Sequence, residues 1–99
     1  MTKGWFVGDF DPCCLSTRAF EVACKHYQAG EYEPKHLHKQ AVELTLIVSG
    51  RVRMLGQEFA TGDIVQIDPG EATDFHVLED TTTVVVKTPS LALDKFLVL

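Results

Sequence analysis

Two histidines one residue apart, His36 and His38, are followed by Glu43, and these are the residues of this 99-residue chain best suited to chemistry. On an extended strand, residues i and i+2 point to the same side with Cα atoms roughly 6.6 Å apart. Both imidazoles can therefore aim at one ion, at bond lengths of about 2.0 to 2.1 Å. Two histidines and one carboxylate form a set that binds first-row divalent metals and leaves positions open for substrate or oxygen.

Glu43 lies an odd number of residues from both histidines, so a straight strand would turn it to the opposite face. We therefore predict a bend or turn within residues 39–42 that leads into a strand over residues 43–49. In that strand Glu43 shares one face with Thr45 and Ile47. If this face is the one lined by the histidines, the three side chains converge.

The rest of the chain has the pattern of an all-β protein. Short segments rich in β-branched and apolar residues are separated by glycines and prolines, and no stretch has helical periodicity over three turns. The alternation in residues 18–27 sets Phe20, Val22, Cys24 and His26 on one face and predicts one buried face. Tight hairpins are expected at Ser49-Gly50 and around Gly56-Gln57. Expected strands cover residues 18–27, 44–48, 51–55, 63–67 and 82–87.

Composition and charge restrict the class of protein. The chain is 45% hydrophobic and 23% charged, which is ordinary for one globular domain over residues 1–99. A net charge of -5 without any lysine or arginine run argues against nucleic acid as a partner. No apolar run approaches the roughly 20 residues of a membrane span. We expect a cytoplasmic protein whose cysteines, Cys13, Cys14 and Cys24, remain free thiols.

A longer frame surrounds the two histidines. Gly30, His36, His38, Glu43 and Gly50 stand at fixed offsets that match G-x5-H-x-H-x4-E-x6-G at every defined position. This frame resembles the first conserved motif of the cupin superfamily, and residues 62–75, GDIVQIDPGEATDF, resemble the second. The resemblance covers nearly the whole chain. It implies a small antiparallel β-barrel, a double-stranded β-helix or jelly roll of two sheets, that is often dimeric and projects its ligands into the lumen.

The second motif departs from the cupin pattern at the position of the fourth metal ligand. Laid on Gly62, the pattern G-x5-P-x-G-x2-H-x3-N places Thr73 at the histidine, and a neutral hydroxyl is a poor ligand for such a metal. Asp74 and His76 are nearby substitutes, but their strand parity points them away unless a bulge re-aims them. Two further pocket candidates are His26, with an exposed strand end as the alternative, and Gln66.

The termini carry apolar residues that a monomer would have difficulty covering. The early segment contains Trp5, Phe6 and Phe10, and residues 91–99 are LALDKFLVL. Exposed apolar area usually marks an interface, and a strand edge needs a partner. We expect a homodimer closed by the terminal strands.

Three functions fit these observations. The first is a cupin that binds one divalent metal (Fe, Mn, Ni or Zn) through His36, His38 and Glu43, with a small organic molecule in the lumen. The second is a metal-free barrel that binds a small ligand or supports an assembly without catalysis. The third is a metal-independent isomerase or epimerase in which the histidines act as acid or base and Glu43 orients them. The resemblance does not select a reaction.

Overall fold

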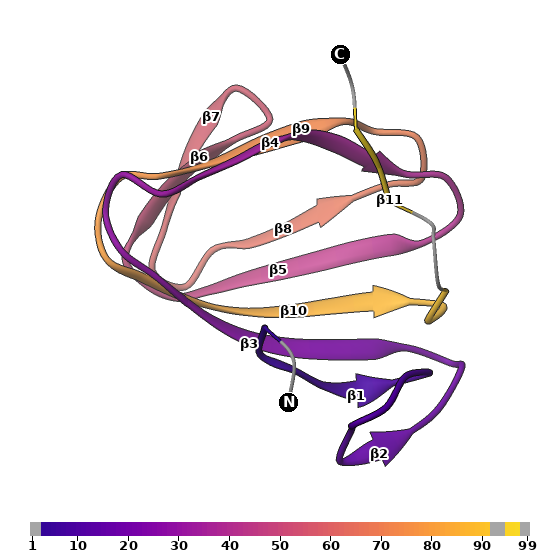
Figure 1. The fold of residues 1–99 in the computed structure, drawn as a ribbon. Helices are drawn as coiled ribbons and strands as arrows, with labels where there is room; N and C mark the ends of the chain where they lie inside the picture. The colour runs from indigo at the N-terminus through magenta and orange to yellow at the C-terminus, as the bar shows by residue number, and fades with distance from the viewer. Residues whose placement is uncertain (1–2, 92–94, 98–99) are drawn as a thin grey trace.

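Two β-sheets face each other in the computed structural model, which describes residues 3–91 and 95–97 (Figure 1). The six-stranded sheet has the order β2 (Leu15–Ser16), β1 (Trp5–Gly8), β3 (Glu21–Tyr27), β10 (Thr81–Thr88), β5 (Val42–Ser49) and β8 (Ile64–Ile67). The five-stranded sheet has the order β11 (Lys95–Leu97), β4 (Tyr32–His38), β9 (Thr73–Val77), β6 (Arg51–Met54) and β7 (Gln57–Ala60). The expected all-β jelly roll is confirmed.

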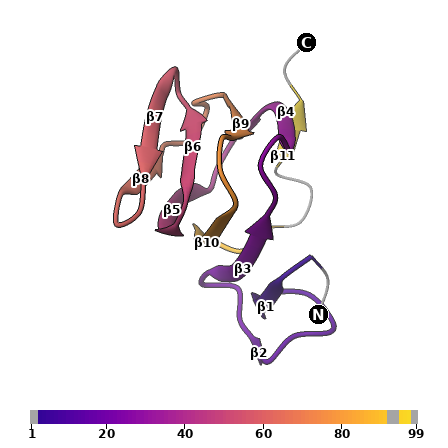
Figure 2. The same cartoon turned by 90° about the vertical axis from the view of Figure 1, so that its left-hand side faces the viewer.

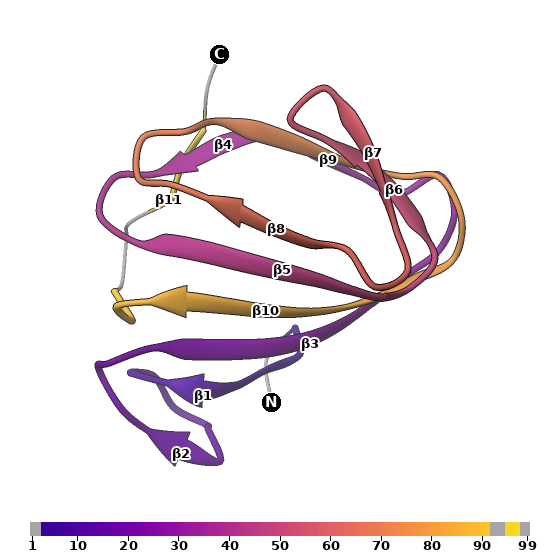
Figure 3. The ribbon, with the colours of Figure 1, turned by 180° about the vertical axis from the view of Figure 1, so that it is seen from behind.

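The chain alternates between the two sheets. From β3 to β10, only the β6–β7 connection stays within one sheet, so successive strands wind around a common lumen. Figure 3 shows from behind that the chain passes between the layers at both ends. Strand pairing is antiparallel except between β1 and β2, which are parallel. Figure 2 shows β1 and β2 on the side of the molecule away from β6 and β7.

The apolar core lies between the sheets beside β6 and β7. Its buried members are Ile47, Val52, Met54, Val65, Ile67, Phe75 and Val77. Burial of Ile47 and Thr45 confirms that the inner face of β5 is the one that carries Glu43. The remainder of the lumen is lined mainly by polar side chains, together with Trp5 and Val85.

The Ser49-Gly50 turn is not the hairpin that the sequence predicts. The strands on either side, β5 and β6, belong to different sheets and do not pair. Gly50 has φ of 107°, and a Cβ there would collide with Thr81 and the Asp80 carbonyl. A glycine is needed because the chain crosses between the sheets against this neighbouring backbone. The second predicted hairpin, β6–β7, is present with Leu55 and Gly56 at its turn, both at positive φ.

The buried face of β3 is also the opposite of the predicted one. Glu21 and Ala23 are buried and face inward together with Lys25 and Tyr27, whereas Phe20 is 37% exposed. Glu21 can be buried because its carboxylate pairs with the ammonium group of Lys87 at 2.9 Å inside the barrel. The apolar face of β3 therefore lies on the outside of the six-stranded sheet.

The terminal segments are partly described. Trp5 lines the cavity between the sheets, and β11 pairs with β4 at the edge of the five-stranded sheet. The predictions for Leu93, Val98 and Leu99 lie outside the described residues. All three cysteines are free. None of the described residues belongs to a helix long and apolar enough to cross a membrane.

Candidate functional site

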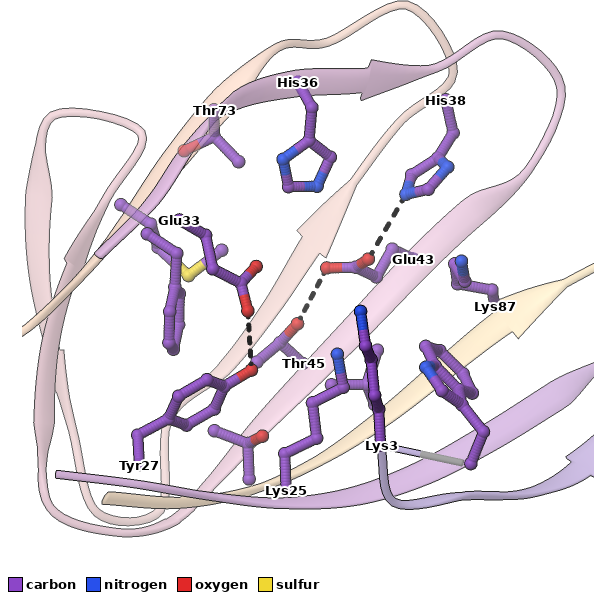
Figure 4. Close-up of a pocket in the computed structure, with 15 residues that line it drawn as sticks. Lys3, Lys25, Tyr27, Glu33, His36, His38, Glu43, Thr45, Thr73 and Lys87 are labelled. Atoms are coloured by element: carbon purple, nitrogen blue, oxygen red, sulfur yellow. Dashed lines mark hydrogen bonds and ion pairs between the residues drawn. The ribbon is translucent and has the colours of Figure 1, made fainter. Parts of the chain in front are cut away.

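A cavity of about 270 Å³ opens between the sheets and is lined by the residues of the predicted metal set. His36 and His38 reach it from β4, and Glu43 reaches it from β5 in the facing sheet (Figure 4). A bend at Lys39 and Gln40 carries the chain from one sheet to the other. This change of sheet cancels the unfavourable strand parity and brings the three side chains to one cavity.

The two imidazoles are held in distinct ways. Nδ1 of His36 lies 2.9 Å from the carbonyl oxygen of Pro34. Because a carbonyl oxygen only accepts, Nδ1 donates, and the neutral ring carries its lone pair on Nε2. A hydrogen bond of this kind commonly fixes the tautomer of metal-binding histidines. The ring of His38 is buried and lies edge-on to that of His36, with centroids 5.7 Å apart.

Glu43 is the carboxylate of this set. Its Oε1 lies 3.6 Å from Nε2 of His38, and its Oε2 accepts a 3.0 Å hydrogen bond from the Thr45 hydroxyl. Burial alone would raise the pKa of Glu43, but the contacts with His38 and Thr45 and the positive charge of Lys87 outweigh it and lower the pKa below its ordinary value. The carboxylate is therefore ionised at neutral pH.

Thr73 occupies the fourth-ligand position of the motif and lies on the cavity wall. Its hydroxyl accepts a 2.8 Å hydrogen bond from the backbone N–H of Leu55 and donates a 2.7 Å bond to the carbonyl oxygen of Asp74. The first bond ties β9 to the β6–β7 turn, and the second lies within β9. The hydroxyl thus has a structural role that competes with metal binding.

The chemistry of the donors fits a divalent transition metal, since two imidazoles and an ionised carboxylate enter one cavity. Among residues 3–91 and 95–97, however, no group of three or more His, Cys, Asp or Glu side chains is arranged to hold a metal ion. His38 and Glu43 instead contact each other. Binding of one ion by all three residues would require these side chains to change position.

The other residues singled out in the sequence lie elsewhere. His26 is exposed on β3, where its Nδ1 lies 3.0 Å from the Thr82 hydroxyl. Gln66 is exposed on β8 and donates to Asp68. His76 is exposed on β9, and its ring lies edge-on to Tyr32. None of these three side chains lines the cavity.

Tyr27 and Glu33 line the cavity, although the sequence pattern did not indicate either of them as a site residue. The Tyr27 hydroxyl donates a 3.0 Å hydrogen bond to Glu33 (Figure 4). Burial and the neighbouring Glu33 carboxylate raise the pKa of Tyr27 far above its ordinary value, so the phenol stays neutral. Glu33 shares the cavity with His36 despite their odd separation because the β4–β9 register shifts between them. Pro34 is the sequence signal that could have indicated this bulge.

Three lysines also line the cavity without having been indicated by the sequence pattern. Lys3, Lys25 and Lys87 line the cavity, and Figure 4 shows their ammonium groups directed toward it. The Trp5 ring lies near two of them, with its centroid 5.1 Å from Nζ of Lys25 and 4.7 Å from Nζ of Lys87. Lysines on the inner face of a strand are not expected from hydropathy, and this is why the sequence did not identify them.

Comparison with solved structures identifies the fold of the chain. No family model matches the sequence, and no curated protein matches it. Among solved structures, an uncharacterised conserved protein with a double-stranded β-helix domain from Klebsiella pneumoniae superposes with a TM-score of 0.74 at 23% identity, over 82% of this chain and 71% of that chain. This chain has the cupin fold.

Two enzymes share this cupin fold with the chain. The DMSP lyase DddQ from Ruegeria pomeroyi matches with a TM-score of 0.70 and 22% identity, over 83% of this chain and 44% of that chain. Oxalate decarboxylase from Bacillus subtilis matches with a TM-score of 0.70 and 17% identity, over 82% of this chain and 24% of that chain. The chain thus spans less than half the length of either enzyme, and the likeness concerns the cupin barrel alone.

Proposed function

We propose that this cupin barrel binds one divalent transition metal through His36, His38 and Glu43, with a small organic molecule beside it in the lumen. The observation that supports the proposal is the arrival of all three side chains at one cavity from two facing sheets. The cavity volume of about 270 Å³ suits a small molecule, since sites for larger ligands range from about 300 to 1,000 Å³.

A metal in this position (Fe, Mn, Ni or Zn) would supply a Lewis acid or, with iron or manganese, a centre for oxygen chemistry. The chain's own residues prepare the site. Pro34 holds the tautomer of His36, and the environment of Glu43 keeps its carboxylate ionised. With Thr73 bound to backbone, three protein ligands would leave open positions for substrate.

A second candidate function is supported by the 3.6 Å contact between His38 and Glu43. A buried histidine oriented by a carboxylate is an arrangement for general acid–base catalysis. Without metal, His38 would move a proton on the bound molecule while Glu43 orients the ring, as an isomerase or epimerase requires. Solvent deuterium incorporated into glyceraldehyde by the metal-free wild type, and not by His38→Gln, would support this candidate.

Metal content decides between the two candidates. Untagged protein prepared without chelator should contain about one metal per chain, which both His36→Ala and His38→Ala lose. His76→Ala is the matched control, because that histidine is exposed outside the cavity, and it should retain the metal. A wild type that stays empty after Fe, Mn, Ni and Zn have each been offered would rule out the metal site.

We also propose a cytoplasmic location. It is supported by the three free cysteines, since reducing compartments keep thiols unpaired. Fractionation of cells that produce the protein tests this, and recovery from an extracellular or periplasmic fraction would contradict it.

A further inference from the structure

The cavity contains groups that neither candidate mechanism uses. Three lysines enter it from separate segments: Lys3 precedes β1, Lys25 lies on β3 and Lys87 lies on β10 (Figure 4). Lysine side chains are rarely turned into a barrel, because burial of an ammonium group is costly without a negative partner. Three lysines at one cavity therefore indicate negatively charged groups nearby or in a bound molecule.

Lys87 is fixed in place by its surroundings. Its Nζ lies 2.9 Å from Oε1 of Glu21, and the Glu21 carboxylate also accepts a 2.9 Å hydrogen bond from Ser90. Lys87 lies opposite Glu43 in the β10–β5 register, and Trp5 packs against its ammonium group. The positive charge at this end of the cavity is therefore built into the sheet.

Thr83 provides an independent observation. Its side chain is 1% exposed and lines the cavity, and its hydroxyl has no hydrogen-bond partner among the described residues. Leaving a buried hydroxyl unsatisfied costs about 1 to 3 kcal/mol. Thr83 lies directly opposite Lys25 in the β10–β3 register, so the two side chains are neighbours on the inner face. A hydroxyl donor beside an ammonium donor suits an anionic acceptor.

The charges of the lining indicate which anion. Lys87 is paired with Glu21, and the carboxylates of Glu33 and Glu43 line the cavity with Lys3 and Lys25, so the surroundings carry no excess of positive charge that would suit a multiply charged anion. We propose that the lumen binds a small organic acid whose single carboxylate is held by Lys25 and accepts a hydrogen bond from Thr83. This inference rests on the proposed function, in that it names the class of molecule that occupies the same cavity.

Titration calorimetry tests the proposal with acetate, glycolate and lactate, the neutral amides of these acids, and inorganic phosphate. At least one acid should bind with a millimolar dissociation constant, and its amide and phosphate should bind about tenfold more weakly or not at all. Lys25→Gln and Thr83→Val should each weaken binding of the acid about tenfold. Lys35→Gln is the matched control, because Lys35 is exposed on β4, and it should bind as the wild type does.

The same titrations are made with protein as purified and after chelator treatment. Binding of the acid to metal-free protein, sensitive to Lys25→Gln, would support the lysine site even if the metal titration fails. Equal binding of acid and amide, no binding by any of the acids, or unchanged binding in both cavity variants would overturn it. Thr83→Val separates a lost contact from misfolding, because removal of an unpaired buried hydroxyl should leave thermal stability unchanged or higher.

A second inference concerns the outer face of the six-stranded sheet. Register places apolar side chains side by side across four strands: Val22, Val86 and Leu44 in one row, and Cys24, Val84, Leu46 and Ile64 in the next. Ile64 is 67% exposed and Leu44 38% exposed. We refer to these seven residues as the outer apolar face. Four strands about 4.8 Å apart give it an area on the order of 300 Å², and such patches are often functional.

We infer that a second copy of this chain covers the outer apolar face. Its seven residues carry no charged side chain, so two copies with net charge -5 can meet there without like charges in contact. The outer apolar face, on the order of 300 Å², is well below the ~800 Å² per partner of a standard interface. We therefore expect a twofold dimer of low affinity, joined through this face rather than through the terminal strands.

Sedimentation velocity over a concentration series tests this inference. The wild type should shift from 11.0 kDa toward twice that mass, and Ile64→Lys and Leu44→Lys should remain monomers with unchanged circular dichroism. Tyr32→Lys changes an exposed aromatic residue of the other sheet and should still dimerise. A wild type that is monomeric at every concentration, or an Ile64→Lys variant that dimerises normally, would overturn the inference.

Discussion

His38 and Glu43 contact each other across the lumen, with Nε2 of His38 3.6 Å from Oε1 of Glu43. The two residues belong to different sheets, β4 and β5, and are separated in sequence only by the bend that joins these strands. The contact therefore joins the two sheets at one edge of the lumen, at the point where we propose that a metal binds.

Replacement of the carboxylate should make stability less dependent on pH. The pKa of Glu43 is lowered from its ordinary 4.5, so the ionised group stabilises the fold above that value and loses this contribution as pH falls through the lower folded pKa. Glu43→Gln should cost about 1 to 3 kcal/mol at pH 7 and much less near pH 3. Urea unfolding of metal-free protein at both pH values measures this. An equal loss at both would contradict the assignment of the pKa shift.

Tyr27 should resist ionisation. The chain has two tyrosines, so Tyr32→Phe leaves Tyr27 alone to report in an ultraviolet titration. Because burial and Glu33 raise its pKa, stability that depends on the neutral phenol is complete below pH 10 and declines above it. We expect tyrosinate absorbance to appear only when the barrel unfolds, as followed by circular dichroism. Glu33→Gln should bring ionisation to lower pH, and normal titration near pH 10 in the folded state would refute the expectation.

The buried pair of Lys87 and Glu21 should matter far more than an exposed pair. Lys87→Met leaves the Glu21 carboxylate without its ammonium partner and should cost about 3 kcal/mol. The control is Arg18→Met, which removes an exposed pair with Asp9 at 3.6 Å and should change stability by less than about 0.5 kcal/mol. Chemical denaturation measures both. If the double variant Lys87→Met with Glu21→Met recovers none of the loss, the pair is not the cause.

The crossing at Gly50 should not tolerate a side chain. Gly50→Ala adds the strain of positive φ to a collision with Thr81, and we expect a loss of about 3 kcal/mol or failure to fold. Gly30→Ala shares the positive φ but meets nothing within 4 Å, so it should cost only about 1 kcal/mol. Thermal unfolding of the two variants compares them directly. Equal losses would mean that the backbone angle alone accounts for the effect.

A histidine at position 73 should complete the metal set. Thr73 lines the cavity opposite His36 in the β4–β9 register, so Thr73→His would add a third imidazole and raise metal affinity about tenfold. Thr73→Val is the control, because it loses the same hydroxyl bonds to Leu55 and Asp74 without gaining a donor. Competition with a chromophoric chelator measures both affinities. No gain over the valine variant would count against a metal at this place.

The sequence predicted the architecture and the approach of His36, His38 and Glu43 to one cavity because both depend on local patterns. Short punctuated strands indicate a β-sandwich or barrel, and the odd spacing of Glu43 requires the bend that the structure contains. The cupin motif supplied the register of His36 and His38 relative to the following strand. These features need no knowledge of distant contacts.

Features that depend on long-range partners could not be predicted. The inward face of β3 is set by pairs with β10 and β4, such as Glu21 with Lys87 and Tyr27 with Glu33, and hydropathy selects the opposite face. The Ser49-Gly50 turn has a hairpin's composition, but the chain changes sheets there, and Gly50 is required because it lies against Thr81 and the Asp80 carbonyl from a distant part of the sequence. The position of Lys25 in the cavity follows from the same reversal of β3.

The register shift between Glu33 and His36 divides β4 into two halves that face the lumen independently. A regular strand of the same length, without this bulge, would place Glu33 and His36 on opposite faces because they are three residues apart. The lumen would then contain either the carboxylate that binds Tyr27 or the two imidazoles, but not both. The single extra residue of the bulge therefore decides whether Glu33 and the two histidines share one chamber, and it is a determinant of the chemistry of the lumen as well as of the fold.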